Sequence, residues 1–134
     1  MARYDHLPIY RSAMKLAVHL ENTVRGFTRY VKYTLGSDMR HEAQRVVGLI
    51  IRANNERDRY PALCELRGSI EQLLVQARIC QESNGFRTFA SFAATIELAG
   101  QVARQSEGWL KPSGTRGAPE SSVSGSASVL RIGW

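Results

Sequence analysis

Basic residues alternate with tyrosines in one short part of the chain, and these residue types can bind anions. Arg25, Arg29 and Lys32 are interleaved with Tyr30 and Tyr33. Arginine and lysine pair with phosphate oxygens, and tyrosine rings stack on nucleic-acid bases. The combination therefore indicates contact with an anionic partner such as a nucleic acid. The alternative is an ordinary loop with solvated basic side chains.

A second group of basic residues is regularly spaced further along the chain. His41, Arg45, Arg52 and Arg59 follow one another at intervals of four, seven and seven residues. If one helix runs through all of them, they share a face, and Gly48 leaves that face open to close approach. The alternative is a solvated helix face.

The overall charge favours an anionic partner. The 134 residues include 18 lysines and arginines against 12 acidic residues, which gives a formal net charge of +6. All but three of the 18 are arginines, whose planar guanidinium pairs bidentately with phosphate or carboxylate. The predicted phosphate-binding residues are Arg25, Arg29, Lys32, Arg40, Arg45, Arg52 and Arg59, with Tyr30 and Tyr33 as stacking candidates.

Catalysis and metal binding are not predicted, so we expect no enzyme activity and no cofactor. The three histidines are scattered, and the chain has no phosphate-binding loop, nucleophile elbow or HExxH sequence. Cys64 and Cys80 lie on one predicted helix, where their separation of roughly 24 Å excludes an intrachain disulfide.

Most carboxylates have spacings that predict surface ion pairs within a helix. Glu56 follows Arg52 by four residues, and Glu71 follows Arg67 by four. Asp38 comes two residues before Arg40 and is expected to serve the same purpose. Such pairs contribute a few tenths of a kcal/mol each, so this pattern points to a surface rather than a catalytic site.

Apolar residues recur at helical spacing in four segments, which predicts an all-α fold. The segments cover residues from about 7 to 27, from 37 onward, from 61 onward, and from 87 to 110. Short links between helices of this length are typical of an antiparallel up-and-down four-helix bundle. No segment shows the alternation expected of a strand.

Three local details follow from this pattern. Gly36 is expected to provide a turn, after which Ser37 caps the second helix. Asn54 follows Ile50 by four residues and is expected to point toward the bundle. Phe89 is expected to begin the apolar stripe of the fourth helix.

The composition changes after Lys111. Residues 112–134 are rich in serine, glycine and proline, which predicts a flexible tail following a bundle domain at 1–111. The first residues contain no uninterrupted apolar stretch typical of a secretion signal, and no apolar run is long enough to span a membrane. We therefore expect a soluble, cytoplasmic protein.

Several short sequences carry a resemblance to a known family. They are Tyr33–Gly36 (YTLG), the Ala53-Asn54 pair followed by Arg59, the single residue Arg78, and Gly108–Leu110 (GWL). With them, the region from about Tyr4 to Lys111 resembles the accessory variability determinant family of diversity-generating retroelements. That family belongs to the wider group of four-helix-bundle proteins first noted in ribosomal RNA intervening sequences.

The resemblance implies a four-helix protomer that assembles into a pentameric ring with a basic surface. It also implies binding to the reverse transcriptase of the same element and to its template RNA or cDNA, in support of mutagenic retrohoming. The rival interpretation is a protein–protein adaptor whose arginines meet acidic patches on a partner or on neighbouring protomers, with no nucleic-acid role.

Overall fold

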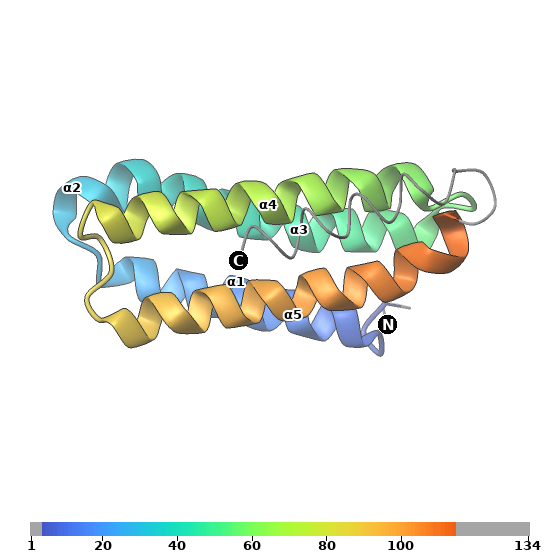
Figure 1. Cartoon of the computed structure of the whole chain (residues 1–134), viewed down its shortest axis with the longest axis horizontal. Helices are drawn as coiled ribbons and strands as arrows, with labels where there is room; N and C mark the ends of the chain where they lie inside the picture. Colours follow the sequence, from blue (N-terminus) through green and yellow to red (C-terminus); the bar gives the residue numbers. More distant parts are fainter. Residues whose placement is uncertain (1–3, 115–134) are drawn as a thin grey trace.

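The computed structural model describes residues 4–114, and their side chains as far as Trp109. This part of the chain is entirely helical, with no strand, which confirms the all-α prediction. Four long helices form a bundle (Figure 1), and a short helical segment precedes the second of them. The elements are α1 (Pro8–Arg25), α2 (Arg29–Val31), the π-helix η1 (Lys32–Gly36), α3 (Ser37–Asn55), α4 (Tyr60–Glu82) and α5 (Phe89–Gly114).

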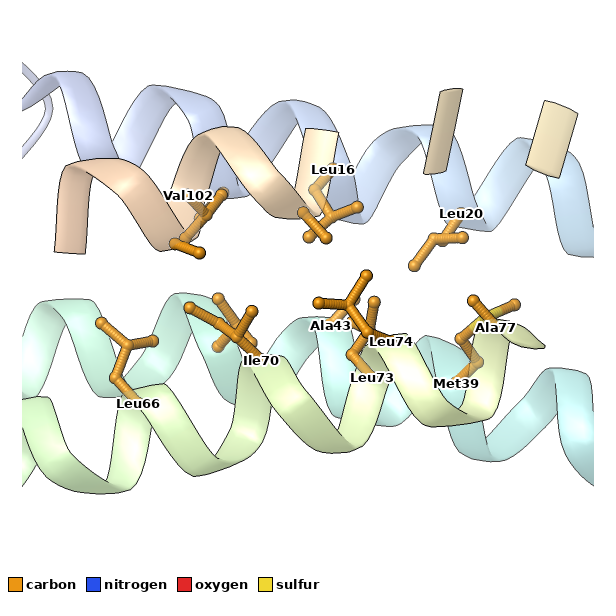
Figure 2. Packing of buried hydrophobic residues seen from close by; sticks show 14 of the residues in the cluster. Leu16, Leu20, Met39, Ala43, Leu66, Ile70, Leu73, Leu74, Ala77 and Val102 are labelled. Carbon is orange, nitrogen blue, oxygen red and sulfur yellow. The ribbon is translucent and has the colours of Figure 1, made fainter. Parts of the chain in front are cut away.

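Each long helix packs against two others, so the four surround one apolar core. α1 contacts α3 and α5, and α4 contacts the same two helices. Figure 2 shows side chains of α1 and α5, such as Leu16 and Val102, pointing toward those of α3 and α4, such as Met39 and Ile70. Burial of an aliphatic side chain of this size contributes about 1.5–3 kcal/mol, so this core is the main source of stability.

The chain becomes helical earlier than the sequence predicts. α2, η1 and α3 follow one another without a break, so helical structure starts at Arg29. Gly36 and Ser37 both have ordinary helical dihedral angles, and no side chain caps α3. The predicted turn at Gly36 and the predicted cap at Ser37 are therefore wrong.

Gly36 has a different role, which is to let two parts of the chain approach closely. A Cβ atom at this position would lie 2.9 Å from Val24 Cγ1 and 3.0 Å from Phe27 Cδ2. Both neighbours are buried, at the end of α1 and just beyond it. The absence of a side chain at Gly36 is what allows the second helix to start beside the end of the first.

We expect Gly36→Ala to destabilise the protein by about 1–3 kcal/mol, because the added methyl group overpacks the core. Gly48→Ala is the matched control, since Gly48 is an exposed helical residue and a Cβ atom added there would have no neighbour within 4 Å. The control should stabilise the protein by about 0.5–1 kcal/mol through helix propensity alone. Urea unfolding measures both, and a stabilising Gly36→Ala would contradict the steric argument.

The connection between α4 and α5 packs against the connection between α1 and α2. Two residues beyond the end of α4, Asn84 is in the left-handed region, at φ 60°, and the Gly85 amide donates to the Cys80 carbonyl (2.8 Å). Arg87 Nε then donates to the Gly26 carbonyl (2.6 Å). Thr88 Oγ1 accepts from the Ser91 amide (3.1 Å) and so caps α5. The two connections therefore form one end of the bundle, at the left of Figure 1.

The two cysteines are both free and both lie on α4, which confirms that they form no intrachain disulfide. Cys80 is buried, and burial raises the pKa of its thiol to about 11. It therefore remains a neutral apolar filler at ordinary pH. Cys64 is exposed.

α5 continues to Gly114, and the predicted tail beyond it lies outside the described residues. Within residues 4–114, none of the helices combines the length and the apolar character that crossing a membrane requires.

A histidine links α1 to α5. His19 Nε2 lies 2.9 Å from Thr95 Oγ1, and Thr95 Oγ1 donates its proton to the Ser91 carbonyl (2.9 Å). A hydroxyl has one proton to donate, and that of Thr95 goes to Ser91. His19 Nε2 is therefore the donor to Thr95 Oγ1. Burial lowers the pKa of His19 below its ordinary value of 6.5.

We expect the free energy of unfolding to fall as the pH drops below 6.5, the ordinary pKa of histidine. The unfolded chain binds the proton more readily than the folded one, so the contribution is complete above 6.5 and is lost through the lower, folded pKa. Urea unfolding over a pH series should show this in the wild type and less of it in His19→Gln. Parallel pH profiles for the two proteins would exclude His19 as the cause.

Candidate nucleic-acid interface

The predicted basic residues fall into two groups that the structure places differently. The first group lies along α3, where Arg40, Arg45 and Arg52 each have a carboxylate partner. Arg40 Nε pairs with Glu21 Oε2 of α1 at 3.1 Å. The Glu21 carboxylate on the neighbouring helix α1 thus balances the charge of Arg40, so this charge is not unpaired and available to a ligand.

Glu65 of α4 is shared by the other two arginines of this group. Arg52 donates to both of its oxygens, through Nη1 (3.3 Å) and Nη2 (3.2 Å), and Arg45 Nη2 lies 3.5 Å from Oε1. Arg52 also pairs with Glu56 at 3.2 Å, as its spacing predicts. The hydrogen bond to Glu65 is the main cause that raises the pKa of Arg52. The positive charge on this side of α3 is therefore largely balanced within the chain.

Arg59 does not lie on the same helix as Arg45 and Arg52. α3 ends at Asn55, and Arg59 precedes the first residue of α4, so the prediction of one helix through His41, Arg45, Arg52 and Arg59 is wrong. The Arg59 guanidinium lies over the Trp109 ring, 4.8 Å from its centroid, in a cation–π contact between the residue that precedes α4 and α5. This residue helps to close the other end of the bundle.

The second group is a bundle-end cluster of four cations: Arg25, Arg29, Lys32 and Arg87. Arg25 is the last residue of α1 and Arg29 the first of α2, while Lys32 begins η1. Arg87 lies in the connection before α5. Its hydrogen bond to the carbonyl of Gly26, the residue after Arg25, holds it at the same end of the bundle. Sequence reasoning missed Arg87 because it lies far along the chain from the others. The sequence offered one signal for Arg87, which is that residues 83–96 contain no acidic residue that could balance its charge.

The bundle-end cluster has no counter-charge of its own. Among residues 4–114, none of its four members has a carboxylate within 4.0 Å, the limit for an ion pair. Residues 22–37 and 83–96, at this end of the bundle, contain the four cations and neither aspartate nor glutamate, and Asp38, Glu82 and Glu97 directly border these ranges. The nearest acidic residue before the first segment, Glu21, is paired with Arg40. A partner with several negative charges would therefore find an unbalanced positive surface here.

Exposed aromatic rings lie at the same end of the bundle. The exposed fractions are 81% for Tyr30, 70% for Tyr33 and 69% for Phe89, higher than for any other exposed large hydrophobic residue that the structure describes. Lys32 Nζ lies 5.5 Å from the centroid of the Tyr33 ring. The structure thus brings cations and exposed aromatic residues together at this end of the bundle.

The predicted core position of Phe89 is wrong, and the reason is a neighbouring phenylalanine. Phe86, in the connection before α5, is buried and packs against the buried Phe27 with ring centroids 4.9 Å apart. Phe86 thereby closes the end of the core, and Phe89 remains on the surface.

A different kind of surface lies on two opposite sides of the bundle. Met14 and Val18 are exposed on α1, and Val75 and Ile79 are exposed on α4. Each pair is four residues apart, so its members are neighbours on their helix. The α1 pair borders a shallow hollow that also includes Tyr10.

Nothing in residues 4–114 brings together three or more His, Cys, Asp or Glu side chains in a way that could hold a metal ion. No protein-family model matches the sequence, and a search of curated proteins finds no match either.

Proposed function

We propose that this protein is a non-catalytic accessory factor of a diversity-generating retroelement, acting in the cytoplasm. It binds the template RNA or its cDNA, together with the reverse transcriptase of the same element, and so supports mutagenic retrohoming. The observation that carries this proposal is the bundle-end cluster, where four cations meet no carboxylate of the described chain. The family resemblance supplies the particular partners.

The proposal includes assembly into a pentameric ring of antiparallel up-and-down four-helix protomers. A ring needs two different surfaces on each protomer, one for each neighbour. The exposed apolar pairs Met14/Val18 on α1 and Val75/Ile79 on α4 supply two such surfaces. They lie on helices that share the same two neighbours, and hence on opposite sides of the bundle.

Two measurements test the proposal. Light scattering on a sizing column gives the mass of the purified full chain, and a mass near five protomers is expected. Co-purification then asks whether the full chain retains the reverse transcriptase and RNA of its own element. A monomer that binds neither would exclude the proposed function.

A protein–protein adaptor is the second candidate. The observation that favours it is the balance of charge on α3, where Glu21 and Glu65 already neutralise the arginines and leave little for phosphates. Salt titration separates the two candidates. Binding to nucleic acid weakens by orders of magnitude over a few-fold rise in salt, whereas a packed protein interface responds much less.

A further inference from the structure

We infer that the bundle end binds nucleic acid in single-stranded form, with bases stacked on the exposed rings of Tyr30, Tyr33 and Phe89. The inference rests on the proposed nucleic-acid function and adds the class of ligand and the residues that select it. The bundle-end cluster would contact the phosphates of the same strand.

The first argument is the accessibility of the rings. Tyr30 and Tyr33 are three residues apart in consecutive helical segments, Tyr30 in α2 and Tyr33 in η1, at the same end of the bundle. Both residues are exposed over more than two thirds of their surface. Two neighbouring aromatic faces of this kind can each take one base of a strand whose bases are unstacked.

Phe89 is held at the surface by a row of aromatic contacts. Ring centroids are 4.9 Å apart for Phe27 and Phe86, 5.5 Å for Phe86 and Phe92, and 5.7 Å for Phe92 and Phe89. The row runs from a buried residue near α2 to the exposed first residue of α5. Phe89 thus packs against Phe92 on one side and remains exposed on the rest of its surface. A residue on which a base stacks needs both features.

The second argument separates a single strand from a duplex. In a duplex the base faces are covered by their neighbours, and the deep, narrow major groove of double-stranded RNA excludes side chains. Exposed aromatic rings would therefore gain little from a duplex. Single-strand-binding surfaces instead combine aromatic rings with a positive surface that follows the backbone, and this end of the bundle has both.

A protein ligand is the competing occupant, because tyrosine and arginine are also enriched in protein interfaces. The distribution of charge favours the nucleic acid. Residues 22–37 and 83–96 contain four cations and no acidic residue, although Asp38, Glu82 and Glu97 border these ranges, so the surface favours a ligand with repeated negative charge. A phosphate backbone supplies such charge at every nucleotide.

The test compares three labelled probes by fluorescence anisotropy with the full chain: oligouridine and oligothymidine of about 20 nucleotides, longer than most single-strand sites, and a fully paired RNA duplex of the same length. The variant is Tyr30→Leu/Tyr33→Leu/Phe89→Leu, which keeps apolar side chains but removes the aromatic faces. Tyr10→Leu, on α1 at the other end of the bundle, is the control for loss of a ring. Circular dichroism checks that all variants remain folded.

We expect the wild type to bind a single strand at least about tenfold more tightly than the duplex, and the triple variant to lose about tenfold or more on single strands. Duplex binding should change less than about twofold, and the control should bind like the wild type. The two single-stranded probes show whether RNA, cDNA or both are accepted. Equal binding of duplex and single strand, or an unaffected triple variant, would overturn the inference and leave the proposed function standing. No binding of any probe would overturn the inference and favour a protein ligand at this end, while co-purification with the element's own RNA decides the proposed function.

Discussion

Replacing Arg25, Arg29, Lys32 and Arg87 together with glutamine is expected to weaken binding to single-stranded RNA by about 100-fold or more at 0.1 M salt. Each phosphate contact on a single strand contributes about 0.7 to the slope of log affinity against log salt, so the slope should fall by about 3. The physical reason is the release of fewer counterions when four phosphate contacts are lost. Anisotropy titrations at several salt concentrations measure both quantities.

The matched control removes four arginines that the structure shows paired with carboxylates: Arg40, Arg45, Arg52 and Arg104. Their replacement by glutamine lowers the net charge by the same amount as the first variant. We expect a loss of less than about tenfold, because those charges are already balanced at short range. Equal losses in both variants would mean that net charge alone governs binding, and a larger loss in the control would place the interface on α3. Thermal unfolding checks that loss of the Arg87–Gly26 hydrogen bond leaves the protein folded.

Leu73→Ala is expected to lower the free energy of unfolding by about 2–5 kcal/mol. Leu73 lies in α4, has no exposed surface, and its side chain lies within the core that Figure 2 shows. Truncation removes buried methyl groups and leaves a cavity that the surrounding helices fill only in part. Since a domain of this size has a total stability of about 5–15 kcal/mol, the loss is a large fraction of it. Urea unfolding measures the change.

Val75→Ala, two residues further along α4, is the control for this prediction. Val75 is 49% exposed, so the loss should stay below about 1 kcal/mol. Equal losses at the two positions would contradict the assignment of Leu73 to the core. A loss at Val75 that grows as the protein is diluted would indicate that α4 contributes to self-association, because the stability of an oligomer depends on protomer concentration.

The apolar periodicity was sufficient to predict the helices and much of the core. In the segment predicted to start at 61, the apolar residues spaced three and four apart are all buried in α4: Leu63, Leu66, Ile70, Leu73, Ala77 and Cys80. The spacing is informative because residues three and four apart must share a face of a helix, whatever the helix packs against.

The prediction for Asn54 is less accurate, since Asn54 is only half-buried and the neighbouring Ala53 is fully buried. The two positions are adjacent on the helix, and packing against the other helices decides which one faces inward.

Ion pairs show where local spacing stops being informative. The pair of Arg52 with Glu56 is present as predicted, but Arg67 pairs with Glu107 of α5, and Arg40 pairs with Glu21 of α1. Partners four residues apart compete with carboxylates that other helices bring within reach. The outcome depends on how the helices pack and turn, which the sequence pattern does not state.

By itself, the sequence determined the helical class, the positions of the four long helices, the excess of arginine and the tyrosines beside the first of those arginines. These follow from residue type and from spacing over a few residues. Only the tertiary structure decided which cations are balanced, since Glu21 and Glu65 reach the arginines of α3 from other helices. It also brought Arg87 and Phe89 to the end of the bundle that holds Tyr30, because the packing of two distant connections sets that contact.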